Sequence, residues 1–527
     1  MGDPVIDHFE EVFLYKLDDP CLKFDALAYI PIPECLNRDN GPNPLLSFSQ
    51  KLYDMLSTGL TDRAKLIHLT LPLTSPHSIR VDGTNLSPAP TRQIIAGLLL
   101  DAAQSNRVVD HGPPAGHKDG ASYRVFWGDK AELRRFKDGS ILESVVWGTK
   151  DLKQSISNQI IQYLVIKNFG DEIGNRIKFI GDEYASAVGG GGAGLFQPTM
   201  AAFEKLIEEL RNLEGLPLAI RQVSPAAPAL RYSSVEVPLF SSGQLMQPAD
   251  VVVQFESSGR WPDDLIAIQK TKIAFLLKMS ELLEKAGVVT RIGLENIDYP
   301  TMNSAFLEVV YYEGSAFRIR IYHDREQTLL ERQLLNKDLL GKKRDEITAA
   351  LSEHRRRFII GPLHAQEVQK LSHRFPALSP SIRLLKRWFQ AHLLSREISE
   401  ELAELMTIRT FVATSPPPNS VMSGFLRTLH FISLWDWRAE PAIIGIVAKS
   451  ALETFDAIRR SDPAMNRHVM VIPTEYDPTG TAFTEFGPRK VVAARVTALA
   501  RSAVGASFKV SFLQSPYYFD GYLTYSV

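Results

Sequence analysis

Residues 248–256 read Pro-Ala-Asp-Val-Val-Val-Gln-Phe-Glu and place one carboxylate, Asp250, at the start of an apolar run. A helical pattern follows over residues 264–286, and Gly287 ends it. Strand-like runs come next, at residues 288–294, 305–312 and 316–322. A carboxylate that opens an apolar strand, with a helix behind it and more strands after it, is typical of a metal-dependent nucleotidyl-transfer site.

The residues that would carry the metal chemistry are missing from this pattern. Two-metal phosphoryl transfer needs carboxylates on one face of neighbouring strands, because the cations lie only about 4 Å apart and share ligands. Side chains alternate along a strand, so the pair should read Asp-x-Asp, but position 252 is Val252. The strand-like run at residues 317–321 places Arg318 and Arg320 where a third carboxylate would lie, and arginines repel cations. We therefore predict a degenerate site with no catalytic residue, metal or cofactor.

A phosphate-holding turn is also absent from the expected place. A Gly-Ser turn that holds the triphosphate should come shortly before Asp250. Ser242-Gly243 is too close to it and in reversed order, and Ser224-Pro225 is too far away. An active nucleotidyltransferase remains the alternative, because Glu256, Glu295 and Glu308 are unassigned and could converge in space.

Composition places the chain among ordinary globular proteins. Its 527 residues are enough for three or four domains. A net charge of −1 gives no overall basicity, so any nucleic-acid binding must come from local patches. Two cysteines, Cys21 and Cys35, argue against a disulfide scaffold and a Cys-based zinc site, and fit a reducing compartment. No apolar run approaches the roughly 18 residues of a membrane span, so no membrane association is expected.

Two basic patches are candidates for phosphate contact. In residues 130–147, Asp138-Gly139 lies between strand-like runs and predicts a tight hairpin, to which Arg134, Arg135 and Lys137 give a basic edge. A solvated strand face explains that edge equally well.

The second patch is helical. In the helix that begins near residue 379, an apolar stripe leaves Arg383, Lys386 and Arg387 to face outward. Arg355 and Arg356 add to this patch. The functional interpretation is backbone contact with RNA, independent of sequence and sensitive to salt. The alternative is a solvated helix face, on a chain that only binds proteins.

The remaining periodicity predicts mixed helix and strand. Packing helices are expected over residues 151–188, with a flexible Gly-rich connector at residues 189–194. Further helices are expected at residues 91–103, 199–213, 397–411, 423–434 and 490–503. Strands are expected at residues 12–15, 26–32, 65–71, 218–223, 469–472, 508–513 and 521–527.

Residues 126–143, Phe-Trp-Gly-Asp-Lys-Ala-Glu-Leu-Arg-Arg-Phe-Lys-Asp-Gly-Ser-Ile-Leu-Glu, resemble a signature of the Nrap family. These are nucleolar RNA-associated proteins of the UtpC module of the small-subunit processome. Stretches at residues 216–234, 383–388 and 424–437 resemble the family too, and the matches fall in order along nearly the whole chain.

The resemblance implies an α+β multidomain fold made of two tandem units like archaeal CCA-adding enzymes. Each unit has a nucleotidyltransferase head, a helical domain like that of poly(A) polymerase and oligoadenylate synthetase, and an RRM-like tail. The chain would then be a fragment without the first head and most of the last tail. Its expected parts are the first RRM-like tail (1–150), connecting helices and linker (151–194), a degenerate head (195–325), a helical domain (326–507) and the start of a further tail (508–527).

The resemblance also implies a function. Heads of the family are regarded as non-catalytic, which agrees with Asp250, Val252, Arg318 and Arg320 as degenerate positions. The expected role is a scaffold in small ribosomal subunit biogenesis, located in the nucleus and nucleolus. Its expected partners are pre-ribosomal RNA and UtpC subunits, including a protein with an RRM-like domain.

Overall fold

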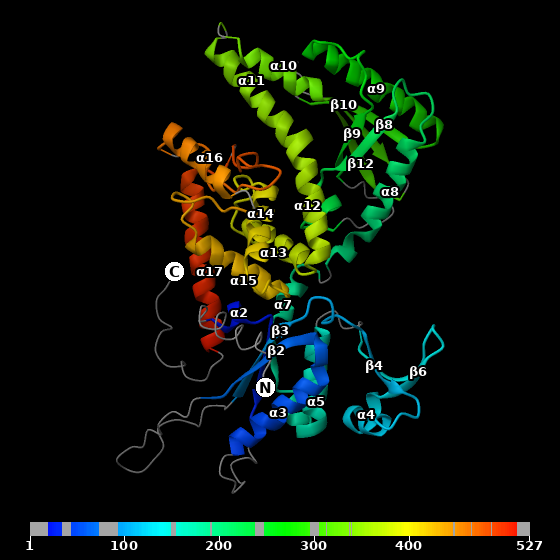
Figure 1. Ribbon diagram of the computed structural model, residues 1–527, viewed down its shortest axis with the longest axis vertical. Coiled ribbons are helices and arrows are strands. Elements are labelled where there is room, and N and C mark those ends of the chain that lie inside the picture. The colour runs from blue at the N-terminus through cyan, green and yellow to red at the C-terminus, as the bar shows by residue number, and fades with distance from the viewer. Residues whose placement is uncertain are drawn as a thin grey trace. The chain divides into compact units, whose positions relative to one another are not determined.

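The computed structural model describes most of the chain (Figure 1). The described residues are 19–33, 44–72, 93–148, 154–189, 192–237, 247–295, 305–311, 313–336, 338, 340–445, 448–464, 466–485 and 487–513. The chain forms two compact units, and each is described by itself. Unit 1 comprises Met1–Gly190, Ser415–His430 and Ala500–Val527, and unit 2 comprises Gly191–Thr414 and Phe431–Leu499.

Unit 1 is built on a four-stranded antiparallel sheet in the order β2-β3-β1-β7. Its elements follow one another as strand, helix, strand, strand, helix and strand: β1 Ala26–Pro31, α3 Pro44–Leu60, β2 Ala64–Thr70, β3 Gln93–Leu100, α5 Ile156–Phe169 and β7 Lys178–Ile180. A βαββαβ chain with the first and third strands at the centre is the ferredoxin-like arrangement. The four-stranded sheet of an RRM is of this kind.

Both faces of this sheet are covered at its centre. Alternate residues of β1, among them Ala28 and Ile30, belong to a core shared with α3 and α5. On the other face, the Phe24 ring lies so close to Gly97 that an added Cβ would be 2.5 Å from it. Tyr29 is buried on that face, and burial raises the pKa of its hydroxyl to about 12. The face on which RRM sheets stack RNA bases is therefore not open in this unit.

Residues 415–430 of unit 1 hold the entrance to β1. The Asn419 backbone N–H and the Ser423 hydroxyl both donate to Asp25 Oδ1, at 2.9 and 2.5 Å. Arg427 donates to the carbonyls of Leu22 and Lys23, at 2.8 and 2.9 Å. The unit is therefore closed by segments about 400 residues apart in sequence.

A second, three-stranded sheet follows β3 in the chain, with strands in the order β4-β6-β5. It consists of β4 Val109–Pro114, β5 Glu132–Arg135 and β6 Ile141–Val146, with α4 Gly120–Trp127 between the first two. The predicted hairpin is confirmed, because β5 and β6 pair antiparallel. Gly139 lies in the turn with a φ of 86°, a backbone angle that residues with a side chain rarely adopt.

Two predictions in unit 1 are wrong. Residues 91–103 do not form a helix, because they contain β3. This run is apolar almost throughout, and periodicity alone does not separate such a strand from a buried helix. The second half of residues 151–188 is not one helix either, since it holds α6 Asp171–Gly174, β7 and α7 Asp182–Ser186. The strands predicted at residues 26–32 and 65–71 are confirmed, while residues 12–15 lie outside the described residues.

Unit 2 begins with a five-stranded sheet in the order β10-β11-β12-β9-β8, in which β9 and β12 are parallel. The strands are β8 Ile220–Pro225, β9 Ala249–Phe255, β10 Val289–Leu294, β11 Ala305–Val310 and β12 Ala316–Tyr322, and the helices are α8 Gln197–Arg211 and α9 Leu265–Lys285. These elements confirm the strands and helices predicted around Asp250. Asp264 caps α9 by accepting the Ala267 N–H at 2.8 Å. One sheet face, with Val251, Val253 and Phe317, packs on both helices.

Helices are the regular elements of the described chain after β12. They are α10 Asp324–Leu334, α11 Gly341–His354, the π-helical η7 Arg355–Ile360, α12 Gly361–Arg374, α13 Leu378–Ala391, α14 Glu400–Ala413, α15 Val421–Leu434, α16 Ala448–Ser461 and α17 Lys490–Leu513. None of the helices among the described residues is long and apolar enough to cross a membrane.

Two predicted strands in this half are wrong. Residues 469–472 are buried but irregular, with the Ala442 and Ile444 N–H groups bonded to the Val471 and Pro473 carbonyls. Residues 508–513 continue α17 instead of forming a strand. Residues 521–527 lie outside the described part of the chain.

Candidate functional site

The face of the unit 2 sheet that carries Asp250 is the candidate site, called here the Asp250 face. Strands β9 and β12 run parallel, so that Arg318 lies opposite Asp250 and Arg320 lies opposite Val252. Side chains at these positions share one face because they alternate with the core residues of both strands. The structure thus brings the four predicted degenerate positions together.

Arginine side chains form ion pairs with the carboxylates of the Asp250 face. Arg320 is only 3% exposed and places Nε 3.5 Å from Asp250 Oδ1 and Nη2 2.8 Å from Glu295 Oε1. Arg318 donates to the same Glu295 oxygen at 3.2 Å and to Glu308 Oε1 at 2.8 Å. The positive charge that neutralises these carboxylates is therefore supplied by side chains.

An aromatic ring fixes the two arginines. Their guanidinium carbons lie 4.6 Å (Arg318) and 5.3 Å (Arg320) from the centre of the Phe306 ring. Phe306 is opposite Gly293 in the neighbouring strand, where an added Cβ would come within 2.2 Å of the ring. A glycine at position 293 thus allows the ring to lie flat against the sheet.

The three unassigned glutamates do not form a shared ligand set. Glu295 and Glu308 are near each other but are paired with arginines. Glu256 follows the far end of β9, about 20 Å along the strand from Asp250. Across the described residues, no three or more His, Cys, Asp or Glu side chains are arranged to hold a metal ion. The donors present do not fit the bridged pair of cations that two-metal transfer requires.

Backbone N–H groups that follow β8 are also hydrogen-bonded within the protein. The N–H groups of Ala226 and Ala227 both donate to the Asp250 carbonyl, each at 3.1 Å. Backbone N–H groups of such a turn hold phosphate in other proteins, but here they bind the chain's own strand. Ser224 and Pro225 belong to β8, and Ser242-Gly243 lies outside the described residues.

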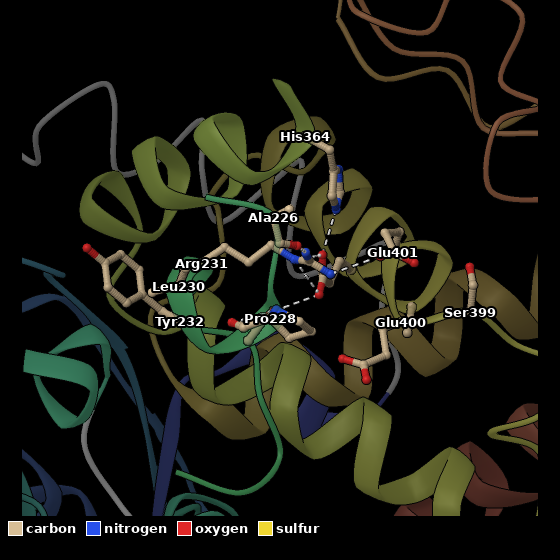
Figure 2. A network of polar contacts seen from close by, with 12 residues as sticks. Ala226, Pro228, Leu230, Arg231, Tyr232, His364, Ser399, Glu400 and Glu401 are labelled. Atoms are coloured by element: carbon tan, nitrogen blue, oxygen red, sulfur yellow. Dashed lines mark hydrogen bonds and ion pairs between the residues drawn. The ribbon is translucent and has the colours of Figure 1, made fainter. Parts of the chain in front are cut away.

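A buried network of charges, part of which Figure 2 shows, lies in the same unit. Its centre is Glu404 of α14. Arg231 ends the short helix η6 Pro228–Arg231 and is buried. Its Nε donates to Glu404 Oε2 at 2.9 Å, its Nη2 to Glu401 at 3.1 Å and its Nη1 to the Ala226 carbonyl at 2.5 Å. Ser233 donates its hydroxyl to Glu404 Oε1 at 2.6 Å. Arg231 and His364 point toward the same place on α14 (Figure 2).

Three helices contribute to this network. Lys386 of α13 donates to Glu404 Oε1 at 2.6 Å, to Glu400 at 2.7 Å and to the Ser233 carbonyl at 2.9 Å. His364 of α12 has Nε2 2.6 Å from Glu404 Oε2 and Nδ1 2.7 Å from the Tyr476 hydroxyl. The network fastens the segment that follows β8 to the helices, and burial leaves Arg231, His364 and Glu404 no access to a substrate.

Burial alone would raise the pKa of Glu404, but Arg231, Lys386 and His364 lower it well below its usual value of 4.5. A carboxyl whose pKa falls on folding stabilises the fold above its unfolded pKa, and this stabilisation is lost as the pH falls through the folded pKa. We therefore expect acid below about pH 4.5 to reduce the free energy of unfolding of unit 2, and Glu404→Gln to remove that part of the pH dependence. Denaturant titrations of the natural sequence and of Glu404→Gln, from pH 6 downward, would measure this loss of unfolding free energy. An equal fall of the unfolding free energy with pH in the two proteins would contradict the prediction.

The outward orientation predicted for Arg383 and Lys386 was wrong. Arg383 is 2% exposed and donates Nε to the Ser234 carbonyl at 3.1 Å, while Lys386 lies in the Glu404 network. Most of helix α13 is buried, and the segment after η6 and helix α14 supply the partners of Arg383 and Lys386. Only Arg387 of the three is exposed.

The other predicted cations lie at the surface. Arg355 is exposed, and half-buried Arg356 donates to Glu353 at 3.0 Å. On β5, Arg134 donates to Glu132 of its own strand at 2.7 Å. Arg135 and Lys137 are exposed beside it.

Family models match nearly the whole chain. Their descriptions are Nrap protein domain 3 for residues 20–170, Nrap protein nucleotidyltransferase domain 4 for residues 179–373 and Nrap protein PAP/OAS1-like domain 5 for residues 375–511. The chain belongs to the Nrap family. The predicted fold class of this Nrap chain, with a nucleotidyltransferase-like head and a helical PAP/OAS1-like domain, is confirmed.

Relatives carry nucleolar names. U3 small nucleolar RNA-associated protein 22 of Schizosaccharomyces pombe is 34% identical over 529 residues, which cover 95% of this chain and 48% of the relative. Nucleolar protein 6 of Homo sapiens is 28% identical, over 89% of this chain and 42% of the relative. This Nrap chain spans about half the length of these relatives.

Solved structures resemble the chain only distantly. Terminal uridylyl transferase 4 from Trypanosoma brucei, with bound UTP and UMP, is 11% identical and matches with a TM-score of 0.35. The match covers 62% of this chain and 98% of that one. A likeness at this level carries no argument about function.

Proposed function

We propose that this Nrap chain is a non-catalytic, RNA-associated scaffold that acts in small ribosomal subunit biogenesis. The observation that carries the proposal is the position of Arg318 and Arg320, which face Asp250 where bound cations would be needed. Guanidinium groups there pair with the carboxylates and oppose metal binding.

The cellular setting is proposed from the relatives. The names U3 small nucleolar RNA-associated protein 22 and nucleolar protein 6 support an association with RNA and a place in the nucleolus. Pre-ribosomal RNA, UtpC subunits and a protein with an RRM-like domain are the proposed partners.

We assign RNA contact to exposed arginines of unit 2. Arg355 and Arg387 are exposed and Arg356 is half-buried, and guanidinium groups at a surface suit phosphate. Arg383 and Lys386 are withdrawn as candidates because they are buried. Stacking on the unit 1 sheet is not proposed, because that face is covered.

Charge reversal tests the assignment. Arg355→Glu and Arg387→Glu are each expected to weaken binding of a fluorescent structured RNA, and each lost phosphate contact should reduce the slope of log affinity against log salt by about 1. Arg332→Glu on α10, also at an exposed position, is the control and should change binding less. Affinities would be measured across a salt titration. Weak binding that does not respond to salt would overturn RNA contact and favour a module that binds only proteins.

A further inference from the structure

The three-stranded sheet of unit 1 ends in an open strand. In the order β4-β6-β5, strand β5 has a neighbour on one side only among the described residues. All four of its residues, Glu132 to Arg135, are exposed. Figure 1 shows β4, β6 and α4 at one side of the unit, beyond α5.

The backbone of β5 presents hydrogen-bonding groups to this open side. The Phe136 N–H donates to the Ser140 carbonyl at 2.9 Å, so position 136 faces β6. Inward and outward positions alternate in an antiparallel pair. With Arg135 opposite Ile141, the N–H and C=O groups of Leu133 and Arg135 point outward. The Ile141 carbonyl agrees with this pattern, because it accepts from Ala115 on the opposite side at 3.0 Å.

Side chains around this edge are apolar and basic. Leu133 is 52% exposed and Ile141 is 45% exposed, and their positions share one face of the hairpin. Exposed Arg135 and Lys137 add positive charge. A short, charged edge strand can simply prevent unwanted pairing, but exposed Leu133 and Ile141 work against that role.

We propose that β5 receives an extended, acidic segment of a partner protein as a fourth strand of this sheet. The outward groups of Leu133 and Arg135 would supply the backbone hydrogen bonds of strand addition. Leu133 would contact an apolar side chain of the segment on the face that it shares with Ile141, and Arg135 and Lys137 would attract its carboxylates. The interaction does not depend on the proposed RNA association.

A protein strand suits this edge better than RNA does. Of the three cations considered for phosphate contact, one, Arg134, is already held by Glu132 at 2.7 Å. RNA phosphate would also make no apolar contact with the exposed side chains of Leu133 and Ile141. The basic edge first considered for RNA is therefore reassigned to an acidic strand.

The test uses the whole chain and three fluorescent probes. One peptide repeats Val-Thr-Glu-Thr, so that Val and Glu alternate on the one face that meets Leu133 and Arg135 (the Val-Glu peptide). The second repeats Val-Thr-Lys-Thr (the Val-Lys peptide), and the third probe is a single-stranded uridine RNA of similar length. The Val-Glu peptide is expected to bind about tenfold or more tightly than the Val-Lys peptide, and Arg135→Gln with Lys137→Gln should reduce that preference.

Leu133→Pro separates backbone pairing from charge. It removes one outward N–H, leaves every basic residue in place, and stands at an edge position that tolerates proline. Leu133→Pro should weaken binding of the Val-Glu peptide about five- to tenfold. Leu133→Thr, which keeps the N–H, should bind the peptide more tightly than Leu133→Pro does. Circular dichroism and Trp fluorescence would check folding.

Three outcomes would overturn the proposal. One is a Val-Glu peptide that binds no better than the Val-Lys peptide, a result that needs no variant. Another is equal binding by folded Leu133→Pro and Leu133→Thr. The third is RNA binding tighter than peptide binding and lost in Arg135→Gln with Lys137→Gln, which would assign the edge to phosphate.

Discussion

Glu404→Ala is expected to lower the free energy of unfolding of unit 2 by about 3–5 kcal/mol, because it removes the one fully buried carboxylate that Arg231 and Lys386 share. The two cations keep only the partly exposed Glu401 and Glu400. Glu404 is fully buried and accepts hydrogen bonds from both cations and from Ser233. The measurement is a urea titration of the whole chain, with hydrogen exchange of peptides from α13 and α14 as the signal of unit 2.

A surface glutamate provides the control. Glu397 pairs with Arg489 at 2.6 Å, but the arginine is 76% exposed, and such pairs contribute little. Glu397→Ala should leave the unfolding of unit 2 unchanged within error. If the two alanine variants behaved alike, the Glu404 network would not be what holds these helices to the segment after β8.

Arg320→Ala is expected to cost unit 2 about 2–4 kcal/mol of unfolding free energy, since it removes a buried guanidinium from two carboxylates and from an aromatic ring. The estimate is below that for Glu404→Ala because Asp250 and Glu295 keep part of their solvent, with side chains 48% and 32% exposed. The same urea titration and hydrogen exchange, followed in peptides from β9 and β12, would measure it.

Arg291 is a matched control for Arg320. It lies on the same sheet and pairs with Glu308 at 2.7 Å, but its side chain is 73% exposed. Arg291→Ala should therefore have a much smaller effect. A neutral Arg320→Ala variant would show that the guanidinium does not support this face, and would weaken the case that it replaces bound cations.

The two variants probe different roles of charge in one unit. Around Glu404, charges are buried and connect helices to the chain that follows β8. On the Asp250 face, Asp250 and Glu295 are partly exposed and lie beside Arg318 and Arg320. In both arrangements, basic side chains pair with carboxylates.

Local patterns predicted most of the unit 2 sheet. Strands β10, β11 and β12 and helix α9 have clear periodicity, and Asp264 caps α9. The arginines on the Asp250 face could be predicted because strand alternation decides which residues share a face. The strand β3 was mistaken for a helix because a continuous apolar run shows neither the helical nor the strand period.

Burial of charge could not be predicted in the same way. Arg231 and Glu404 are 173 residues apart, and no local pattern pairs residues over that distance. A glutamate within the apolar run around Leu402 and Met406 was a usable signal, because such a residue needs a buried partner. The predicted exposure of Arg383 and Lys386 was wrong, because helical periodicity identifies one buried stripe of a helix and does not show what covers its other sides.

Nucleotide addition is the most direct test of the proposal that the chain is a non-catalytic scaffold. The whole chain would be incubated with a structured RNA, each of ATP, CTP, GTP and UTP, and Mg²⁺ or Mn²⁺, beside Asp250→Asn. Neither protein is expected to extend the RNA, while the same preparations should bind it in a salt-dependent way. Extension by the natural sequence that is lost in Asp250→Asn would contradict the account, and would mean that Asp250 serves a metal site despite the arginines beside it.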